Sequence, residues 1–185
     1  MPAGGLPASF VAALLSLARA CEAYRKATGS HAVLVGGAAA AIYSAGAFMS
    51  GDFDVVAADD VAFDGAMRLE GFLPEDRPGH LHLGYYHPDH LQHGFQPVSG
   101  RLFDGLADLA RIAVVIVGRD GPAIALPSVE DMIADRLGQA MVSSPGDPSR
   151  LMQARHLYRL AASLDMAYLE RRVREEGGEF DILLE

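Results

Sequence analysis

Apolar residues in the first third of the chain recur at two spacings, each typical of one kind of secondary structure. Intervals of three and four over residues 7–26 predict an amphipathic helix. The residues on its apolar face are Phe10, Leu14, Leu17, Cys21 and Tyr24. The short apolar runs at 31–35 and 52–55 predict two strands, and the alanine-rich stretch 38–43 predicts a helix between them.

Caps and turn residues divide the rest of the chain. Residues 61–70 predict a helix that is capped by Asp59 or Asp60. Proline and glycine positions then separate a strand-rich middle. Its predicted strands are residues 77–86, 91–98, 112–117 and 123–126. Three further helices follow, and their predicted caps are Ser128, Asp147 and Asp165.

This order of elements predicts the fold class and the domains. Strands interleaved with helices at the front and helices at the back indicate an α/β (α+β) fold, with a mixed sheet flanked by helices and a helical carboxy-terminal part. We expect an α/β core over residues 1–127 and a helical region over residues 128–185 packed on it. The two parts are separate domains or form one domain.

Composition and charge narrow the function classes. Half of the 185 residues are hydrophobic, which is enough for a sizeable core, and the net charge is −9. A negative charge argues against non-specific DNA binding, which needs clustered Lys and Arg. The amino terminus has no basic region of a secretion signal, and no apolar run reaches the roughly 20 residues that span a bilayer. We therefore expect a cytoplasmic protein with no membrane partner.

Two glycines stand between the first predicted strand and its helix. Gly36 and Gly37 let the backbone turn sharply and approach a ligand, because neither residue carries a Cβ atom. The following helix directs its first amide groups and the positive end of its dipole toward this turn, where a phosphate can bind. The same glycines also suit simple close packing, so both interpretations stay open.

Two carboxylates follow on the second predicted strand. Side chains at i and i+2 of a strand point to one face, so Asp52 and Asp54 project together, roughly 7 Å apart at Cα. Phe53 and Val55 then point into the core. Two like charges near a partly buried edge destabilise a protein unless a cation binds between them. Oxygen ligands favour Mg²⁺, which also retains water and binds substrate phosphates.

A Gly-Gly pair, a helix and then Asp-x-Asp between apolar residues resemble the signature of the nucleotidyltransferase superfamily typified by DNA polymerase beta. Within it, the chain resembles small bacterial proteins related to the AbiE-type toxins of toxin–antitoxin systems and to the minimal nucleotidyltransferases. The resemblance covers about residues 31–177. It implies a nucleotidyltransferase-like sheet in which Gly36 and Gly37 bind the triphosphate of an NTP, and Asp52 and Asp54 bind one or two Mg²⁺ ions.

The resemblance also implies nucleotide contacts beyond the glycines and aspartates. Ser50 matches a Ser or Thr that is common in the family, which implies a contact to a phosphate. Arg136 stands where a helix of the family usually carries a basic residue facing the nucleotide, and Arg can bind phosphate through two hydrogen bonds. The residues alone equally allow Arg136 an ion pair with Glu130, Asp131 or Asp135.

The family places a third carboxylate on a neighbouring strand, and Gln96 occupies this position in the segment 91–100. Glutamine has a similar shape, but it cannot act as a general base. The loss of a general base typically lowers the rate by about 10² to 10⁴. If the segment is aligned differently, Asp89, Asp104 or Asp108 supplies the missing acid.

The histidines raise a different hypothesis. His80 and His82 share one face of a predicted strand, and His87, His90 and His93 follow closely. Together they offer enough imidazole groups for a Zn²⁺ site. Their spacing matches no strong zinc signature, so solvent-facing histidines in a strand and a turn are the simpler interpretation.

Two function classes remain. The first is a Mg²⁺-dependent enzyme that transfers a nucleoside monophosphate from an NTP to an acceptor hydroxyl, with Asp52, Asp54 and Gln96 in its catalytic site. The acceptor is a small molecule, a protein side chain or an RNA end. The second is a nucleotide-binding or regulatory protein, of the toxin–antitoxin type, that keeps the fold without a full set of carboxylates.

Overall fold

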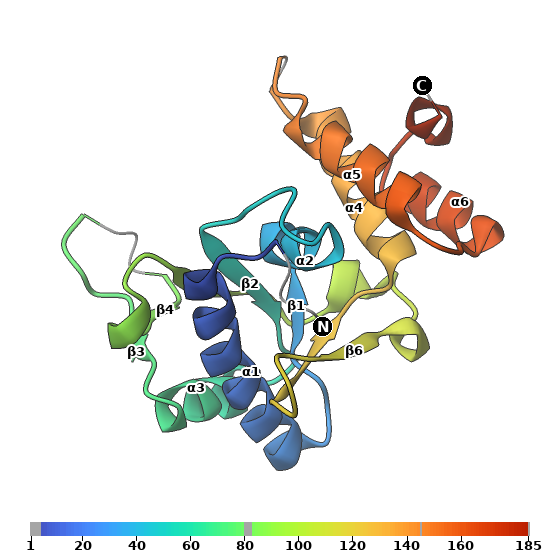
Figure 1. The fold of residues 1–185 in the computed structure, drawn as a ribbon. Helices are drawn as coiled ribbons and strands as arrows, with labels where there is room; N and C mark the ends of the chain where they lie inside the picture. The colour runs from blue at the N-terminus through green and yellow to red at the C-terminus, as the bar shows by residue number, and fades with distance from the viewer. Residues whose placement is uncertain (1–4, 80–82, 145, 185) are drawn as a thin grey trace. The chain divides into compact units, whose positions relative to one another are not determined.

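The computed structural model describes residues 5–79, 83–144 and 146–184. The chain divides into two compact units, of which the first consists of Met1–Leu102 and Ala113–Leu126 and the second of Phe103–Ile112 and Pro127–Glu185. The first unit contains the sheet, and the second is helical (Figure 1). The segment Phe103–Ile112 thus groups with the carboxy-terminal helices, although it precedes the last two strands in the sequence.

The first unit is built on a mixed sheet. Over the described residues, this sheet has seven strands in the order β3-β4-β5-β2-β1-β7-β6. The strands are β1 (Val33–Val35), β2 (Asp52–Val56), β3 (Leu73–Pro74), β4 (Tyr85–Tyr86), β5 (Gly94–Ser99), β6 (Ala113–Ile116) and β7 (Ala123–Leu126). β2 is parallel to β5 and antiparallel to β1, while β1 is parallel to β7. The mixed sheet with its helices confirms the predicted fold class.

The helices lie close to their predicted positions. They are α1 (Ala8–Thr28), α2 (Gly36–Tyr43), α3 (Asp60–Leu69), α4 (Val129–Val142), α5 (Ser149–Leu160) and α6 (Met166–Glu175), with the 3-10 turns η1 (Pro88–His90), η2 (Leu102–Gly105), η3 (Leu109–Arg111) and η4 (Phe180–Leu183). The carboxylates of Asp59 and Asp165 and the hydroxyl of Ser128 each accept a backbone N–H of the following helix, as predicted. Within the described ranges, no helix combines the length and apolar character needed to cross a bilayer.

Aromatic rings connect α1 to the centre of the sheet. α1 packs against α3 (Figure 1). It brings Phe10 onto Phe53 of β2 with 4.8 Å between the ring centroids. Phe53 also stacks on Phe95 of β5 at 5.1 Å. All three rings are fully buried. The side of β2 that carries Phe53 therefore faces the core, and the residues on either side of Phe53 point to the opposite side.

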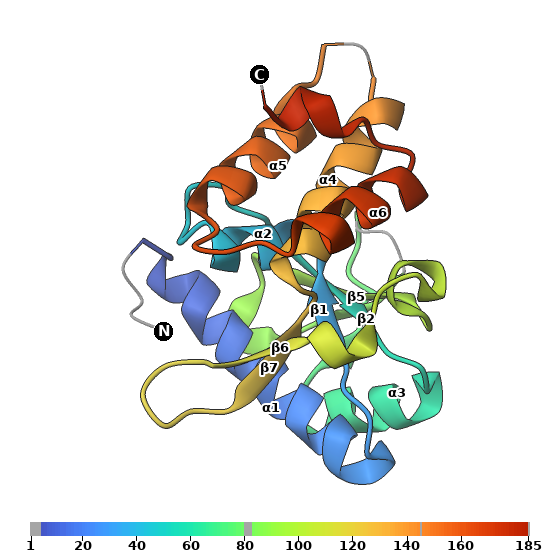
Figure 2. The ribbon, with the colours of Figure 1, turned by 90° about the vertical axis from the view of Figure 1, so that its right-hand side faces the viewer.

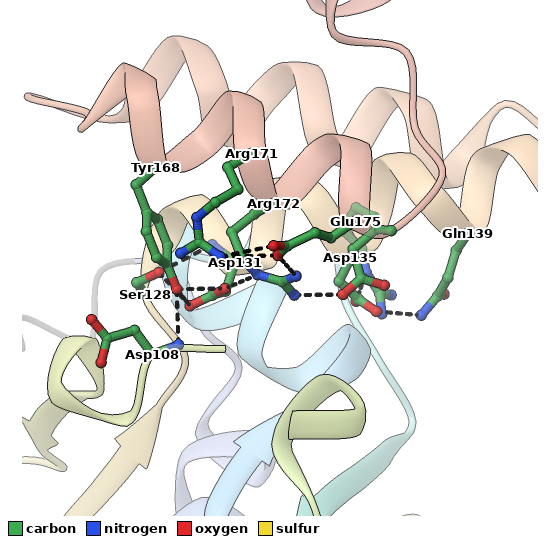
Figure 3. Close-up of polar contacts among 11 residues, drawn as sticks. Asp108, Ser128, Asp131, Asp135, Gln139, Tyr168, Arg171, Arg172 and Glu175 are labelled. Atoms are coloured by element: carbon green, nitrogen blue, oxygen red, sulfur yellow. Dashed lines mark hydrogen bonds and ion pairs between the residues drawn. The ribbon is translucent and has the colours of Figure 1, made fainter. Parts of the chain in front are cut away.

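Buried charges join two helices of the second unit. α4 packs against both α5 and α6 (Figure 2). Arg172 of α6 is fully buried and donates to Asp131 of α4 at 2.7 Å. Its other nitrogens donate to Glu175 and Glu176. Tyr168 donates its hydroxyl to Asp131 at 3.1 Å (Figure 3). One buried guanidinium thus binds three carboxylates, and charge-assisted hydrogen bonds join α4 to α6.

The prediction of one long strand over residues 77–86 is wrong. Among residues 77–79 and 83–86, only the last two form a strand, β4, and residues 80–82 lie outside the described part of the chain. Pro78 and Gly79 explain the break, because proline lacks an N–H for the ladder and Gly79 adopts a positive φ of 85°.

The start of the second helix also differs from the prediction. We expected a separate turn at Gly36 and Gly37 before a helix at residues 38–43, but α2 begins at Gly36 itself. Gly36 has a φ of 68°, a left-handed conformation that glycine adopts without strain. The sharp change of direction is therefore made by one residue, and Gly37 already belongs to the first turn of the helix.

Candidate functional site

β2 presents its two aspartates on one side. Asp52 is exposed and Asp54 is half-buried, whereas Phe53 and Val55 are fully buried. This alternation confirms that both carboxylates lie on one face of a strand. It is the face opposite the one on which Phe53 contacts α1.

Glycines leave room for both carboxylates. A Cβ atom at Gly36 would lie closer than 3.0 Å to Asp54 Oδ2, and one at Gly94 would lie 2.7 Å from Asp52 Oδ1. The Gly94 amide also donates a hydrogen bond to Asp52 Oδ1 at 3.2 Å. A larger residue at either position would displace a carboxylate, so these two glycines form a cradle around the acids.

Ser50 lies beside the second glycine of α2. A Cβ atom at Gly37 would come within 2.8 Å of Ser50 Oγ. The Ser50 hydroxyl donates to the Asp52 carbonyl oxygen at 3.0 Å, which fixes the turn through Gly51 at the start of β2. The structure thus brings Gly36, Gly37 and Ser50 together with the aspartates. They surround the first turn of α2, whose leading N–H groups have no partners within the helix.

β5 places Gln96 next to Asp54. These two residues are partners in the parallel register of β2 and β5, and Asp52 is the partner of Gly94 in the same way. Because side chains alternate along a strand, partnered residues of neighbouring strands point to the same side of a sheet. Gln96 therefore lies on the aspartate face of the neighbouring strand, as expected if it occupies the position for which the family resemblance implies a third carboxylate.

The alternative acids lie outside β5. Asp89 belongs to η1, where its backbone N–H donates to His87 Nδ1 at 3.1 Å. Asp104 and Asp108 belong to the second unit. There the Asp108 carboxylate caps η3 by accepting the amide of Ala110 at 3.0 Å. The register of β5 therefore favours Gln96 over these three aspartates.

A cleft of about 300 Å³ opens beside Asp52 and Gln96, and its wall also includes Glu75 and Arg77. Arg77 binds Glu75 through two nitrogens and donates to the Leu91 carbonyl oxygen at 3.0 Å. The hydrogen bond to Glu75 raises the pKa of Arg77. The pair was not expected from the sequence, because Arg77 was assigned to a strand and no local pattern pairs it with Glu75.

A tyrosine forms another part of the cleft wall. Tyr85 lines the cleft and donates its hydroxyl to Asp64 at 2.9 Å. Burial raises the pKa of Tyr85 to about 12, and the hydrogen bond to Asp64 adds to this effect. Because Tyr85 is the register partner of Phe95, its ring lies on the Phe95 side of the sheet and its hydroxyl is directed at α3 instead of the aspartates.

Arg136 belongs to the second unit. It is buried on α4, where its Nε donates to Asp135 Oδ2 at 2.9 Å. Gln139 donates to the other oxygen of Asp135 at 3.0 Å. Of the interpretations left open by the sequence, the ion pair with Asp135 is thus present, and a contact of Arg136 to a nucleotide stays a prediction.

The three described histidines of the proposed zinc cluster bind other groups. Their partners are the Asp89 amide for His87 Nδ1, Ser16 Oγ for His90 Nε2, and the Gly51 carbonyl oxygen for His93 Nδ1. Burial, assisted by the nearby His87, lowers the pKa of His90. The other two members, His80 and His82, lie outside the described residues. Within those residues, no group of three or more His, Cys, Asp or Glu side chains is arranged to hold a metal ion.

The chemistry of the aspartate pair fits Mg²⁺. This ion is commonly bound by one or two carboxylates, while water and substrate phosphates complete its shell. Asp52 and Asp54 supply two carboxylates on one face, and Gly36 and Gly94 keep the space next to them free of side chains. The arrangement can therefore hold a hard cation and a phosphate beside the amino-terminal end of α2.

Replacement of the first glycine tests this cradle. We expect Gly36→Ala to weaken cation binding, because its Cβ would displace Asp54, and to destabilise the fold by about 1–2 kcal/mol through its left-handed φ. Mn²⁺ titration and urea unfolding measure the two effects. Gly65→Ala on α3 is the matched control, since a Cβ atom there meets no neighbour. Equal cation binding by both variants would contradict the cradle.

Comparison with known proteins identifies the fold. No protein-family model matches this sequence, and no curated protein matches it. The crystal structure of an antigenic nucleotidyltransferase-like protein from Paracoccidioides brasiliensis has a TM-score of 0.57 and 12% identity, covering 87% of this chain and 86% of that one. The solution structure of the antibiotic-resistance factor ANT(2'')-Ia has a TM-score of 0.53 and 18% identity, covering 89% and 91%. The chain therefore has a nucleotidyltransferase-like fold.

Proposed function

We propose that this chain is a metal-dependent nucleotidyltransferase that moves a nucleoside monophosphate from an NTP to an acceptor hydroxyl. The observation that carries the proposal is the cradle, in which Asp52 and Asp54 share one face of β2 between Gly36 and Gly94. The nucleotidyltransferase-like fold supports the proposal. Within this fold, the two glycines lie in α2 and the two aspartates lie in β2.

The residues have separate roles in this reaction. Asp52 and Asp54 hold one or two Mg²⁺ ions, which supply positive charge to the phosphates and to the oxygens of the displacement. The first turn of α2, at Gly36 and Gly37, binds the triphosphate through backbone amides. Ser50 contacts a phosphate when its hydroxyl turns away from the Asp52 carbonyl oxygen. In the transfer, the acceptor oxygen forms a bond to the α-phosphorus and pyrophosphate leaves.

The acceptor enters the cleft beside Gln96. This cleft adjoins Asp52, and its volume of about 300 Å³ suits a small molecule or one protruding group of a larger molecule. Gln96 can hydrogen-bond the acceptor but cannot take its proton. The proton therefore leaves to water or to a phosphate oxygen, which predicts a slow reaction compared with an enzyme that has a general base.

Gln96 also favours a second candidate function. With an amide next to Asp54, the site has two carboxylates and no base on the neighbouring strand. The same arrangement suits a protein that binds Mg²⁺ and nucleotide without turnover. Such a protein has a regulatory role, for example as a toxin–antitoxin component.

Incubation with α-labelled NTPs separates the two functions. We expect Mg²⁺-dependent transfer of label to an acceptor or to the protein itself, with release of pyrophosphate, and no transfer in EDTA. Binding of labelled NTP that requires Mg²⁺, without release of pyrophosphate at any protein concentration, would favour the regulatory function. Absence of both binding and transfer for all four NTPs would contradict both.

Restoration of a carboxylate tests the placement of Gln96. We expect Gln96→Glu to tighten Mg²⁺ binding by about tenfold, because an added charge next to Asp54 attracts the cation. Isothermal titration with Mg²⁺ measures this change. Gln92→Glu adds the same charge to the same cleft without a place in the β2–β5 register, and it is the matched control. If both variants bind Mg²⁺ like the wild type, Gln96 does not occupy the acidic position.

A further inference from the structure

We propose that His93 is a positioning residue, which holds the segment Gly51–Asp52 in the place from which Asp52 binds a cation. The role of Asp52 in cation binding is part of the proposed function, on which this inference rests. The position of His93 follows from its own contacts. The imidazole Nδ1 lies 2.9 Å from the carbonyl oxygen of Gly51, the residue directly before Asp52. A carbonyl oxygen only accepts hydrogen bonds, so Nδ1 carries the proton and donates.

The chain next to His93 makes a second contact to the same segment. Gly94 donates its backbone N–H to Asp52 Oδ1 at 3.2 Å. The two neighbouring residues therefore bind both the backbone that precedes Asp52 and the carboxylate of Asp52. The pairing of β2 with β5 begins at Asp52 and Gly94. These contacts therefore lie at the end of the ladder where both strands begin.

Aromatic packing fixes the orientation of the ring. His93 is 7% exposed and lies edge-to-face against Phe53, with 5.3 Å between ring centroids, and against Phe10 at 6.2 Å. Both phenylalanines belong to the core that joins α1 to β2. A ring held in this way directs its Nδ1–H at one atom, so the position of the Gly51 carbonyl is set by the core itself.

The second ring nitrogen shows that packing alone does not explain a histidine here. His93 Nε2 is buried and has no hydrogen-bond partner within the described residues. An unpartnered buried polar atom is unfavourable, and an apolar ring of similar size would fill the same space without it. The feature that a phenylalanine could not reproduce is the hydrogen bond from Nδ1 to Gly51.

Two substitutions separate the hydrogen bond from the packing. His93→Phe keeps an aromatic ring and removes the donor, whereas His93→Asn keeps an N–H at the position of Nδ1 and removes the ring. His90→Phe is the matched control, because His90 is equally buried in the same segment but bonds to Ser16 of α1. The full chain is used throughout, and urea unfolding identifies any variant that does not fold.

The first readout is the affinity for Mn²⁺ in the presence of ATP. We expect His93→Phe to weaken it about 10- to 100-fold, as for other residues that orient a metal ligand. His93→Asn should recover most of the affinity despite its smaller side chain, and His90→Phe should bind like the wild type. Equal weakening in His93→Asn and His93→Phe, or in His90→Phe, would show a packing role and overturn the proposal.

The second readout does not depend on the function. Long-range ¹H–¹⁵N spectra of the wild type should show His93 protonated at Nδ1, and the Gly94 amide should exchange slowly with solvent. We expect this protection to persist in His93→Asn and to fall in His93→Phe. If the wild type binds no cation, the proposed function fails while these spectra still decide the geometry. A ring protonated at Nε2, or equal Gly94 protection in both variants, refutes the positioning role.

Discussion

The Asp54→Asn variant is expected to lose nucleotidyl transfer by roughly 10³-fold, because an amide replaces a carboxylate that holds the cation, and a lost metal contact raises the barrier by several kcal/mol. Asn has nearly the same shape as Asp, so the cradle around Gly36 stays filled and β2 stays paired with β1 and β5. Transfer of the α-label from NTP to an acceptor or to the protein, under saturating Mg²⁺ and NTP, measures the effect.

Asp60→Asn is the matched control for this variant. Asp60 is an exposed residue in the first turn of α3, and its replacement removes the same charge from the first unit outside the cradle. We expect its transfer rate to equal that of the wild type. If Asp54→Asn also retains the full rate while remaining folded, Asp54 does not hold the cation and the proposed reaction is wrong.

The Arg172→Met variant is expected to be less stable by about 3–5 kcal/mol, because it removes one partner of a buried ion pair and leaves the other charge without compensation. The carboxylate that loses its partner is Asp131 of α4, which is 1% exposed and forms an ion pair with Arg172 at 2.7 Å (Figure 3). Glu175 and Glu176 also lose their shared cation. Urea unfolding followed by circular dichroism measures the change in the free energy of unfolding.

Arg171→Met is the control, since it changes the neighbouring arginine of the same helix. Arg171 is 48% exposed, and its ion pair with Glu175 lies at the surface. We expect this variant to lose less than about 1 kcal/mol, as exposed ion pairs do. Equal stability of the two variants would mean that methionine packing offsets the loss of the buried cation.

Local sequence rules predicted the elements that carry the site. Period-two alternation placed Asp52 and Asp54 on one side of β2, because this alternation depends only on the strand itself. Capping chemistry located the starts of α3, α4 and α6 in the same way, through Asp59, Ser128 and Asp165. The fold class followed from the order of these elements.

Contacts between distant segments explain what the sequence did not show. Glu75 and Arg77 form a cleft wall because β3 and β4 bring these two residues to the same cleft as β5. His93 was interpreted as a solvent-facing histidine, although it lies against Phe10, which is far away in the sequence. Such residues are determined by packing across the sheet, and a single sequence without its fold carries no local pattern for them. The roles of the site residues in binding and transfer stay predictions.

The side-chain amide of Gln96 also affects the protein when no cation is bound. Before any cation arrives, the face formed by β2 and β5 bears two mutually repelling groups at Asp52 and Asp54, where a glutamate in place of Gln96 would add a third. Gln96 therefore favours the pairing of β2 with β5 when no Mg²⁺ is bound. It also lowers the affinity that we expect for Mg²⁺. If Asp52 and Asp54 bind Mg²⁺ as proposed, the occupancy of the site follows the free Mg²⁺ concentration of its surroundings.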